Sequence, residues 1–164
     1  MKTARNYQAI LSAPFGVLGI CCDDEALTGI DFLPPDFLPQ APASPFAQTV
    51  CKQLAAYFAN PDFSFSLPLK PNGTAHQHKV WQAMLAIPRG QTRQYGELAW
   101  ELTSSPRAIG QACGANPIPI VIPCHRVVSK AGLGGFAHHR AGYELGIKRW
   151  LLSHEAANVA SGGA

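Results

Sequence analysis

The feature that most constrains this chain is a short apolar run at 118–128, rich in β-branched residues and interrupted by Pro123-Cys124-His125. An apolar run of this length, bounded by prolines, is typical of a buried extended segment. Pro123 fixes its own φ angle and lacks a backbone donor, so it ends any strand ladder immediately before the thiol. We therefore expect Cys124 to be held by rigid, buried backbone rather than by a loose loop.

His125 is the nearest candidate base for this thiol. A cysteine must be deprotonated to act as a nucleophile, and an imidazole titrates near neutral pH. In extended backbone, consecutive side chains point to opposite faces, so either the chain turns between Cys124 and His125 or a water relays the proton. A structural cysteine followed by a surface histidine is the alternative, and for an isolated pair it would be the commoner arrangement.

Charge is distributed unevenly along the 164 residues, which suffice for one domain or two small ones. Residues 1–75 hold four basic and six acidic side chains, whereas residues 76–164 hold nine basic and four acidic ones. The second half is therefore the candidate for binding a polyanion, although ordinary scatter of surface charge would give the same balance. With 47% hydrophobic residues the chain can build a core.

Cysteine usage indicates a reducing compartment. The five cysteines are odd in number and form no Cys-x-x-Cys pair, and the sequence has neither a signal-peptide region nor an apolar run that could span a membrane. We expect free thiols, a cytoplasmic protein with no membrane partner, and no metal site. The cysteines are Cys21, Cys22, Cys51, Cys113 and Cys124.

The first half has the pattern of a small strand meander followed by a helix. Turn residues separate three apolar runs, a proline-rich stretch follows, and a helical period precedes a last alternating run and a linker. The predicted strands are Tyr7–Ala13, Val17–Cys22, Ala26–Leu33 and Phe63–Leu67; the helix is Phe46–Phe58, the irregular connection is Pro34–Pro45, and the linker is Leu67–Gly73.

The second half is predicted to be mostly helical. One helix begins after the N-cap Thr74 and ends before Pro88. Helices at Gly96–Leu102 and Pro106–Ala115, the latter capped by Ser105, form a helix-turn-helix candidate, a pattern that many αα-hairpins share. The residues expected on the buried side of the first helix are Val80, Trp81, Met84, Leu85 and Ile87.

The helix at 106–115 is unusually rich in small residues. Its two glycines are poor choices for a stable exposed helix, but small residues allow close backbone approach. Such a slim face suits the narrow minor groove of DNA, and it suits tight helix–helix packing equally well. The spacing alone leaves both open.

A last helix is predicted at Tyr143–His154, with apolar residues at helical spacing. Glu155 then falls at its C-terminal end, where the helix dipole disfavours an anion. A carboxylate in this position suggests a cationic or hydrogen-bonding partner, although a solvated surface glutamate is the alternative.

Residues 116–128, Asn-Pro-Ile-Pro-Ile-Val-Ile-Pro-Cys-His-Arg-Val-Val, resemble the signature of the O6-alkylguanine-DNA alkyltransferases, and the likeness extends from about Thr74 to Glu155. The resemblance implies an α/β, ribonuclease H-like N-terminal domain at 1–73, with a small antiparallel sheet and a helix. It also implies a mostly α-helical C-terminal domain at 74–164, with a winged helix-turn-helix. The implied protein is a monomeric DNA repair enzyme that needs no cofactor.

The implied reaction is direct reversal of damage. The alkyl group moves irreversibly, once per protein molecule, from flipped-out O6-alkylguanine in double-stranded DNA to Cys124; O4-alkylthymine is a second implied substrate. The catalytic residues implied are Cys124, His125, Glu155, Asn116 and Tyr95. The DNA-binding residues implied are Arg107 as the intercalating finger, with Ala108, Gly110, Gln111, Cys113 and Gly114. The pocket residues implied are Tyr95, Pro119, Val127, Phe136 and Ala137.

Several residues depart from the family pattern or leave alternatives open. The segment His138–Gly142 lengthens the pocket wall, and Gln111 is bulkier than the small residue expected on the DNA-facing helix. Arg126 is expected to be structural or directed at a phosphate. A damage sensor that binds DNA without transfer and a thiol hydrolase are the competing functions; Cys124 argues against such a sensor, and we see no sequence sign of an oxyanion site.

Overall fold

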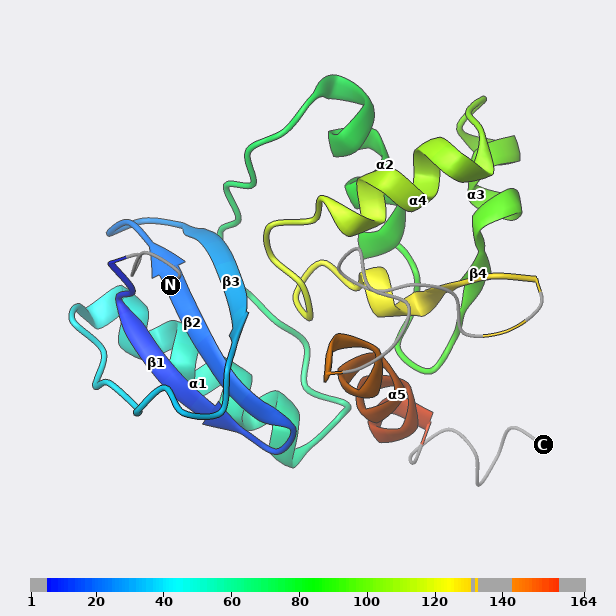
Figure 1. Ribbon diagram of the computed structural model, residues 1–164. Helices are drawn as coiled ribbons and strands as arrows, with labels where there is room; N and C mark the ends of the chain where they lie inside the picture. Colours follow the sequence, from blue (N-terminus) through cyan, green and yellow to red (C-terminus); the bar gives the residue numbers. More distant parts are fainter. Residues whose placement is uncertain (1–5, 131, 133–142, 157–164) are drawn as a thin grey trace. The chain divides into compact units, whose positions relative to one another are not determined.

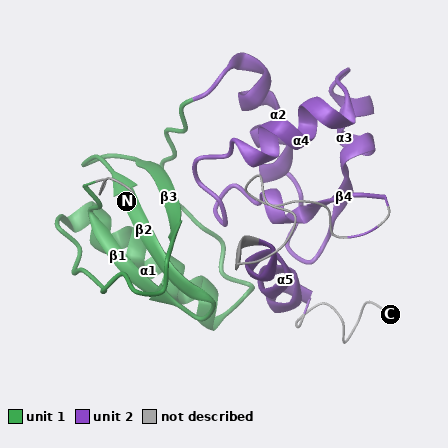
Figure 2. Cartoon of the chain, in the orientation of Figure 1, with its two compact units in different colours: residues 1–72 green, residues 73–164 purple. Residues whose placement is uncertain are grey.

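The computed structural model describes residues 6–130, 132 and 143–156 of the chain (Figure 1). Two compact units can be distinguished, Met1–Asn72 and Gly73–Ala164 (Figure 2). The first holds a three-stranded sheet and one long helix, and the second holds four helices and a two-stranded pairing among its described residues.

The sheet of the first unit is an antiparallel meander in the order β1 (Ala9–Ala13), β2 (Gly16–Cys22) and β3 (Leu27–Leu33). The turn between β2 and β3 is closed by Asp23, whose Oδ1 accepts the backbone N–H groups of Glu25 and Ala26, each at 2.7 Å. A carboxylate that bonds its own backbone two and three residues on is a recognised turn former. The predicted meander is therefore confirmed.

Helix α1 (Pro45–Ala59) packs against β1 and β2 and closes the core of this unit. It begins where Ser44 accepts the backbone N–H of Ala47 at 3.1 Å, which satisfies one of the donors left open at a helix start. The buried residues recur at helical spacing and are Ala47, Val50, Leu54 and Tyr57.

The strand predicted at Phe63–Leu67 is wrong. Exposure does alternate along this segment, but its backbone joins no ladder. The N–H of Ser66 donates to Oε1 of Gln53 on α1 at 2.9 Å, so the segment follows the helix instead of the sheet. Just after this segment, Leu69 forms an isolated parallel bridge with Leu27 of β3. Alternation identifies an extended segment but does not supply a neighbouring strand.

Helix α2 (Ala75–Leu85) begins at the predicted cap Thr74, which forms a capping box. Its buried residues are Val80, Trp81 and Met84. Leu85 was expected on this side but is 40% exposed, because each residue advances about 100° round the helix and Leu85 has passed the buried stripe. Ile87 is buried, as expected, just beyond the helix.

Helices α3 (Tyr95–Glu101) and α4 (Pro106–Gly114) pack against each other and form the predicted helix-turn-helix. Ser105 caps α4 by accepting the backbone N–H of Ala108 at 3.1 Å. In the turn, Thr103 has a φ of 53°, a left-handed conformation that β-branched residues rarely adopt. Only four residues, 102–105, connect the two helices, and Thr103 lies in this short connection. The fold class predicted from the sequence, a small antiparallel α/β domain followed by a helical domain, is confirmed.

No helix among the described residues combines the length and the apolar character needed to cross a bilayer.

Candidate active site

The segment that leads from α4 to Cys124 is buried, as expected, but it turns instead of extending. The N–H of Ile122 donates to the carbonyl of Ile118 at 2.9 Å, and Pro119 and Ile122 form an isolated bridge. Ile120 has a φ of 77°, which is an uncommon and strained value for a β-branched residue. The apolar run predicted burial correctly, but the same burial is achieved by a turn, and the sequence pattern does not distinguish the two.

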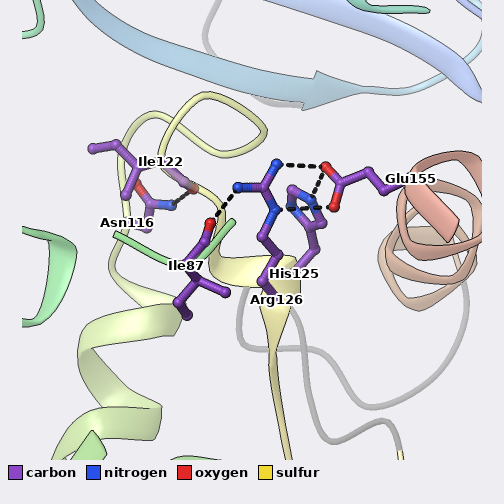
Figure 3. Close-up of polar contacts among 6 residues, drawn as sticks. All are labelled: Ile87, Asn116, Ile122, His125, Arg126 and Glu155. Atoms are coloured by element: carbon purple, nitrogen blue, oxygen red, sulfur yellow. Dashed lines mark hydrogen bonds and ion pairs between the residues drawn. The ribbon is translucent and has the colours of Figure 1, made fainter. Parts of the chain in front are cut away.

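Asn116 holds this turn in place (Figure 3). Its Nδ2 donates to the carbonyl of Ile122 at 2.8 Å, and its Oδ1 accepts the N–H of Ile118 at 3.0 Å. The same side chain hydrogen-bonds Cys124 and favours the anionic form of the thiol. Asn116 therefore links the end of α4 to the cysteine through one amide.

Cys124 opens a 3₁₀ turn, η1 (Cys124–Arg126), which continues into β5 (Val127–Val128). β5 pairs in parallel with β4 (Arg93–Gln94), the short strand just before α3. Of the two arrangements that adjacency to His125 allowed, the chain adopts a turn. Burial raises the pKa of the Cys124 thiol to about 11, against the opposing effects of the Asn116 hydrogen bond and the positive charge of Lys148.

His125 is fully buried and lies against Glu155, which is 1% exposed. Nε2 of the imidazole and Oε2 of the carboxylate are 2.8 Å apart. A carboxylate can only accept, so Nε2 carries the proton and Nδ1 keeps the lone pair. Among the described residues Nδ1 has no hydrogen-bond partner, which leaves it available to take a proton. Burial lowers the pKa of His125, although the bond to Glu155 acts the other way.

Arg126 also reaches Glu155, with two donors (Figure 3). Its Nε lies 2.9 Å from Oε1 and its Nη2 lies 2.8 Å from Oε2, while Nη1 donates to the carbonyl of Ile87 at 2.7 Å. Burial alone would raise the pKa of Glu155, but the hydrogen bonds from His125 and Arg126 lower it below its usual range. The carboxylate stays ionised inside the protein because it is fully hydrogen-bonded.

Helix α5 (Tyr143–Ala156) carries Glu155 in its last turn, and it also carries a buried lysine that the sequence analysis missed. Lys148 is fully buried, and its Nζ donates to the carbonyl of Val127 at 2.8 Å. The same atom lies 5.9 Å from the ring centroid of Tyr95, at the start of α3. Burial lowers the pKa of Lys148 to about 8, although the neighbouring Cys124 and Cys113 thiols act in the opposite direction. The available signal was its position on the apolar stripe of α5, three residues from both Leu145 and Leu151.

Helix α4 presents one exposed face and one buried face. Arg107 and Gln111 are exposed, and a Cβ added at Gly110 would meet no atom within 4 Å. Cys113, expected among the DNA-binding residues, is buried, and its thiol lies close enough to Cys124 and Lys148 to interact with both electrostatically. Its side chain is therefore not part of the exposed face, because the helical period turns it toward the core.

The remaining expected positions are divided between described and undescribed segments. Ala108 and Gly114 are half-buried on α4, and Pro119 and Val127 are buried on either side of Cys124. Phe136 and Ala137, with the segment His138–Gly142, lie outside the described residues. Within the ranges that the structure describes, no group of three or more His, Cys, Asp or Glu side chains is arranged to hold a metal ion.

Comparison with known proteins assigns both units. Residues 75–157 match the model of the 6-O-methylguanine DNA methyltransferase DNA-binding domain, and residues 6–71 match that of its ribonuclease-like domain. The methylated-DNA–protein-cysteine methyltransferase of Methanosarcina acetivorans is 38% identical, over 91% of this chain and 97% of that protein. The Haemophilus influenzae protein of the same name is 39% identical, over 91% of this chain and 86% of its own length.

The fold is also similar to that of solved structures. The crystal structure of the Mycobacterium tuberculosis O6-methylguanine methyltransferase has a TM-score of 0.76 and 34% identity, covering 90% of this chain and 91% of that one. A structure of the M. tuberculosis protein in complex with DNA has a TM-score of 0.75 with the same coverage. On these grounds the chain belongs to the 6-O-methylguanine DNA methyltransferase family.

Proposed function

We propose that this protein repairs DNA by moving an alkyl group from O6 of an alkylated guanine to Sγ of Cys124, with each molecule acting once. The activity is that of a methylated-DNA–protein-cysteine methyltransferase, as in its relatives. The observation that carries the assignment to these residues is the buried His125–Glu155 pair on the residue next to Cys124. A buried carboxylate such as Glu155 needs hydrogen-bonding or cationic partners. Here one partner is His125, the candidate base next to the Cys124 thiol.

The alkyl transfer consists of a proton transfer from Cys124 followed by attack of the sulfur on the alkyl carbon. Nδ1 of His125 takes the thiol proton, directly or through a water, and the sulfur attacks the alkyl carbon. The carbon–O6 bond breaks, its electron pair stays on the guanine, and a thioether forms on Cys124. The thiolate is stabilised by the Asn116 hydrogen bond and by the nearby charge of Lys148. A thioether is not readily hydrolysed, so the cysteine is not regenerated.

Proton donation to the guanine is assigned to Tyr95. This residue begins α3, and its ring lies beside the Lys148 ammonium. A nearby cation makes a phenol a better donor because it stabilises the phenolate. Donation to the ring of the departing guanine would neutralise the charge that develops as the carbon–O6 bond breaks.

DNA binding is assigned to the exposed face of α4 in the second unit. A flipped nucleotide leaves a gap in the base stack, and Arg107, exposed in the first turn of α4, can fill it with a planar cation. The open space at Gly110 lets the helix backbone approach the groove. Arg107 could also bind a phosphate, which would support binding but not flipping.

Finer features of the substrate and the protein are also part of the proposal. O6-alkylguanine in duplex DNA is the principal substrate, with O4-alkylthymine as a secondary one. The protein acts as a monomer without cofactor, in the cytoplasm, where its five free cysteines stay reduced.

Intact mass spectrometry tests the function. The protein is mixed with a duplex oligonucleotide that contains one O6-methylguanine, with Cys124→Ala as the control. We expect one methyl group per protein, mapped to Cys124, and none on the variant, which should still bind the duplex. Binding without a mass gain would identify a damage sensor, and repeated turnover of an ester would identify a hydrolase. Either result would refute the proposal.

A further inference from the structure

Each of the three nitrogens of the Arg126 guanidinium is hydrogen-bonded within the protein, although the proposed mechanism gives this residue no role. Nε and Nη2 bond the two oxygens of Glu155, and Nη1 bonds the carbonyl of Ile87, which follows α2. Its side chain is only 14% exposed. Binding a phosphate would require breaking contacts that tie η1 to two helical segments, so the expectation that Arg126 is directed at phosphate is not supported by its geometry.

The guanidinium of Arg126 has two electrostatic effects on the neighbouring His125–Glu155 pair. First, it donates two of the three hydrogen bonds drawn to the buried Glu155 carboxylate in Figure 3. The carboxylate therefore does not depend on an imidazolium for its stabilisation. Second, its own positive charge disfavours a second positive charge on the adjacent imidazole. A His–Glu pair without this cation would hold a proton more tightly, and a protonated His125 cannot accept the proton of Cys124.

We propose that Arg126 is a positioning residue that keeps Glu155 ionised and His125 in its neutral, proton-accepting form before alkyl transfer. This inference rests on the proposed function of Cys124 and His125 and adds a reason for the third residue of their tripeptide. Arg126 touches neither the sulfur nor the substrate in this scheme; it acts through its bonds to Glu155 and through the effect of its charge on His125.

The charged groups that act on His125 lie on two elements, α5 and η1, and each affects its protonation. Glu155 on α5 favours the imidazolium, whereas Arg126 on η1 and Lys148 on α5 disfavour it, as does burial. The group contributed from the α2 side is the carbonyl of Ile87, which is neutral and accepts a hydrogen bond from Arg126. Removing Arg126 deletes one of the two opposing cations and leaves Glu155 dependent on His125 for a positive partner, so we expect the proton affinity of His125 to rise.

The test is the pH dependence of single-turnover methyl transfer in Arg126→Met, Arg126→Lys and the wild type. Loss of the charge in Arg126→Met should move the acid-side midpoint of the rate upward by about one pH unit, the lower end of the effect of a nearby charge. Arg126→Lys retains the charge but not the fork, so its midpoint should stay near the wild-type value even if its rate falls. Arg149→Met, which removes an exposed arginine of the same helix α5, is the matched control and should leave the profile unchanged.

Two results would overturn the inference. A rate for Arg126→Met that falls equally at every pH would mean that Arg126 only supports the fold. Equal midpoint shifts in the Met and Lys variants would mean that its charge is not the cause. A wild type that gains no methyl group would instead refute the proposed function, which separates the two failures.

A direct titration covers the case in which the variants do not fold. In wild-type protein labelled with ¹⁵N-histidine, the His125 signals, assigned by difference with His125→Gln, should show a neutral ring with the proton on Nε2 at pH 7. An imidazolium at pH 7 would overturn the inference without any measurement of activity.

Discussion

Replacing Lys148 by methionine should change how the stability of the second unit depends on pH. The lysine is fully buried, and burial lowers its pKa to about 8 from 10.5. In the unfolded chain the amine binds its proton more tightly than in the fold. Below pH 8 the free energy of unfolding of the wild type is therefore reduced, and this reduction disappears as pH rises from 8 to 10.5.

The size of this reduction follows from linkage. A shift of this size corresponds to about 3 kcal/mol at pH 7, of which about 2 kcal/mol is relieved by pH 9.5. Methionine does not titrate, but it leaves the carbonyl of Val127 without the Lys148 hydrogen bond, a loss of about 1–3 kcal/mol at either pH. We expect Lys148→Met to be more stable than the wild type by about 0–2 kcal/mol at pH 7 and less stable by about 0–2 kcal/mol at pH 9.5, a change of about 2 kcal/mol between the two pH values.

Urea unfolding at pH 7.0 and 9.5, followed by tryptophan fluorescence, measures this directly. All three tryptophans, Trp81, Trp100 and Trp150, lie in the second unit, so the signal reports that unit. Lys79→Met, which removes an exposed lysine on α2, is the control, and its effect should be the same at both pH values. If the difference between wild type and Lys148→Met were also independent of pH, the assignment of a buried, depressed amine would be wrong.

Three further substitutions test separate parts of the site. Asn116→Ala removes two hydrogen bonds from buried backbone groups, so it should destabilise the protein by about 2–4 kcal/mol in urea and slow methyl transfer. Ile120→Gly should be more stable than Ile120→Ala by about 1 kcal/mol in the same assay, because only glycine accepts the φ of 77° without strain; the usual order, with alanine more stable, would contradict the turn. Arg107→Ala should slow transfer from duplex DNA more than transfer from the free alkylated base in a competition assay, and equal losses would argue against the finger role.

The sequence predicted the elements of this fold well because their boundaries are set by local chemistry. Thr74 and Ser105, both expected as caps, each accept a backbone N–H at the start of a helix, and their residue types favour this position. The errors occur where the pattern of apolar residues predicts burial or alternation but does not determine the course of the backbone. Phe63–Leu67 alternates without joining the sheet, and the run before Cys124 is buried in a turn.

The partners within the site were predictable only in part. Glu155 stands out because an anion at a helix C-terminus needs compensation, and the compensation is provided by two neighbouring residues of one turn. That Arg126 would be the second of these could not be predicted, since an arginine near a DNA-binding segment equally suggests a phosphate contact. Lys148 could not be predicted in the same way, because a lysine beside an apolar stripe ordinarily extends its amine to solvent, whereas this one is buried and bonds the carbonyl of Val127.

The 3₁₀ turn explains how three consecutive residues serve three different purposes. In a strand, side chains alternate between two faces, so Cys124 and Arg126 would share one face and His125 would point away from both. With about three residues per turn, successive side chains diverge by about 120°. The imidazole and the guanidinium can then both reach Glu155, while the Cys124 thiol is left to the influence of Asn116, which lowers its pKa. A strand at this position would bring the guanidinium to the sulfur's face and away from the carboxylate that His125 needs, so the chemistry depends on the turn as much as on the residue types.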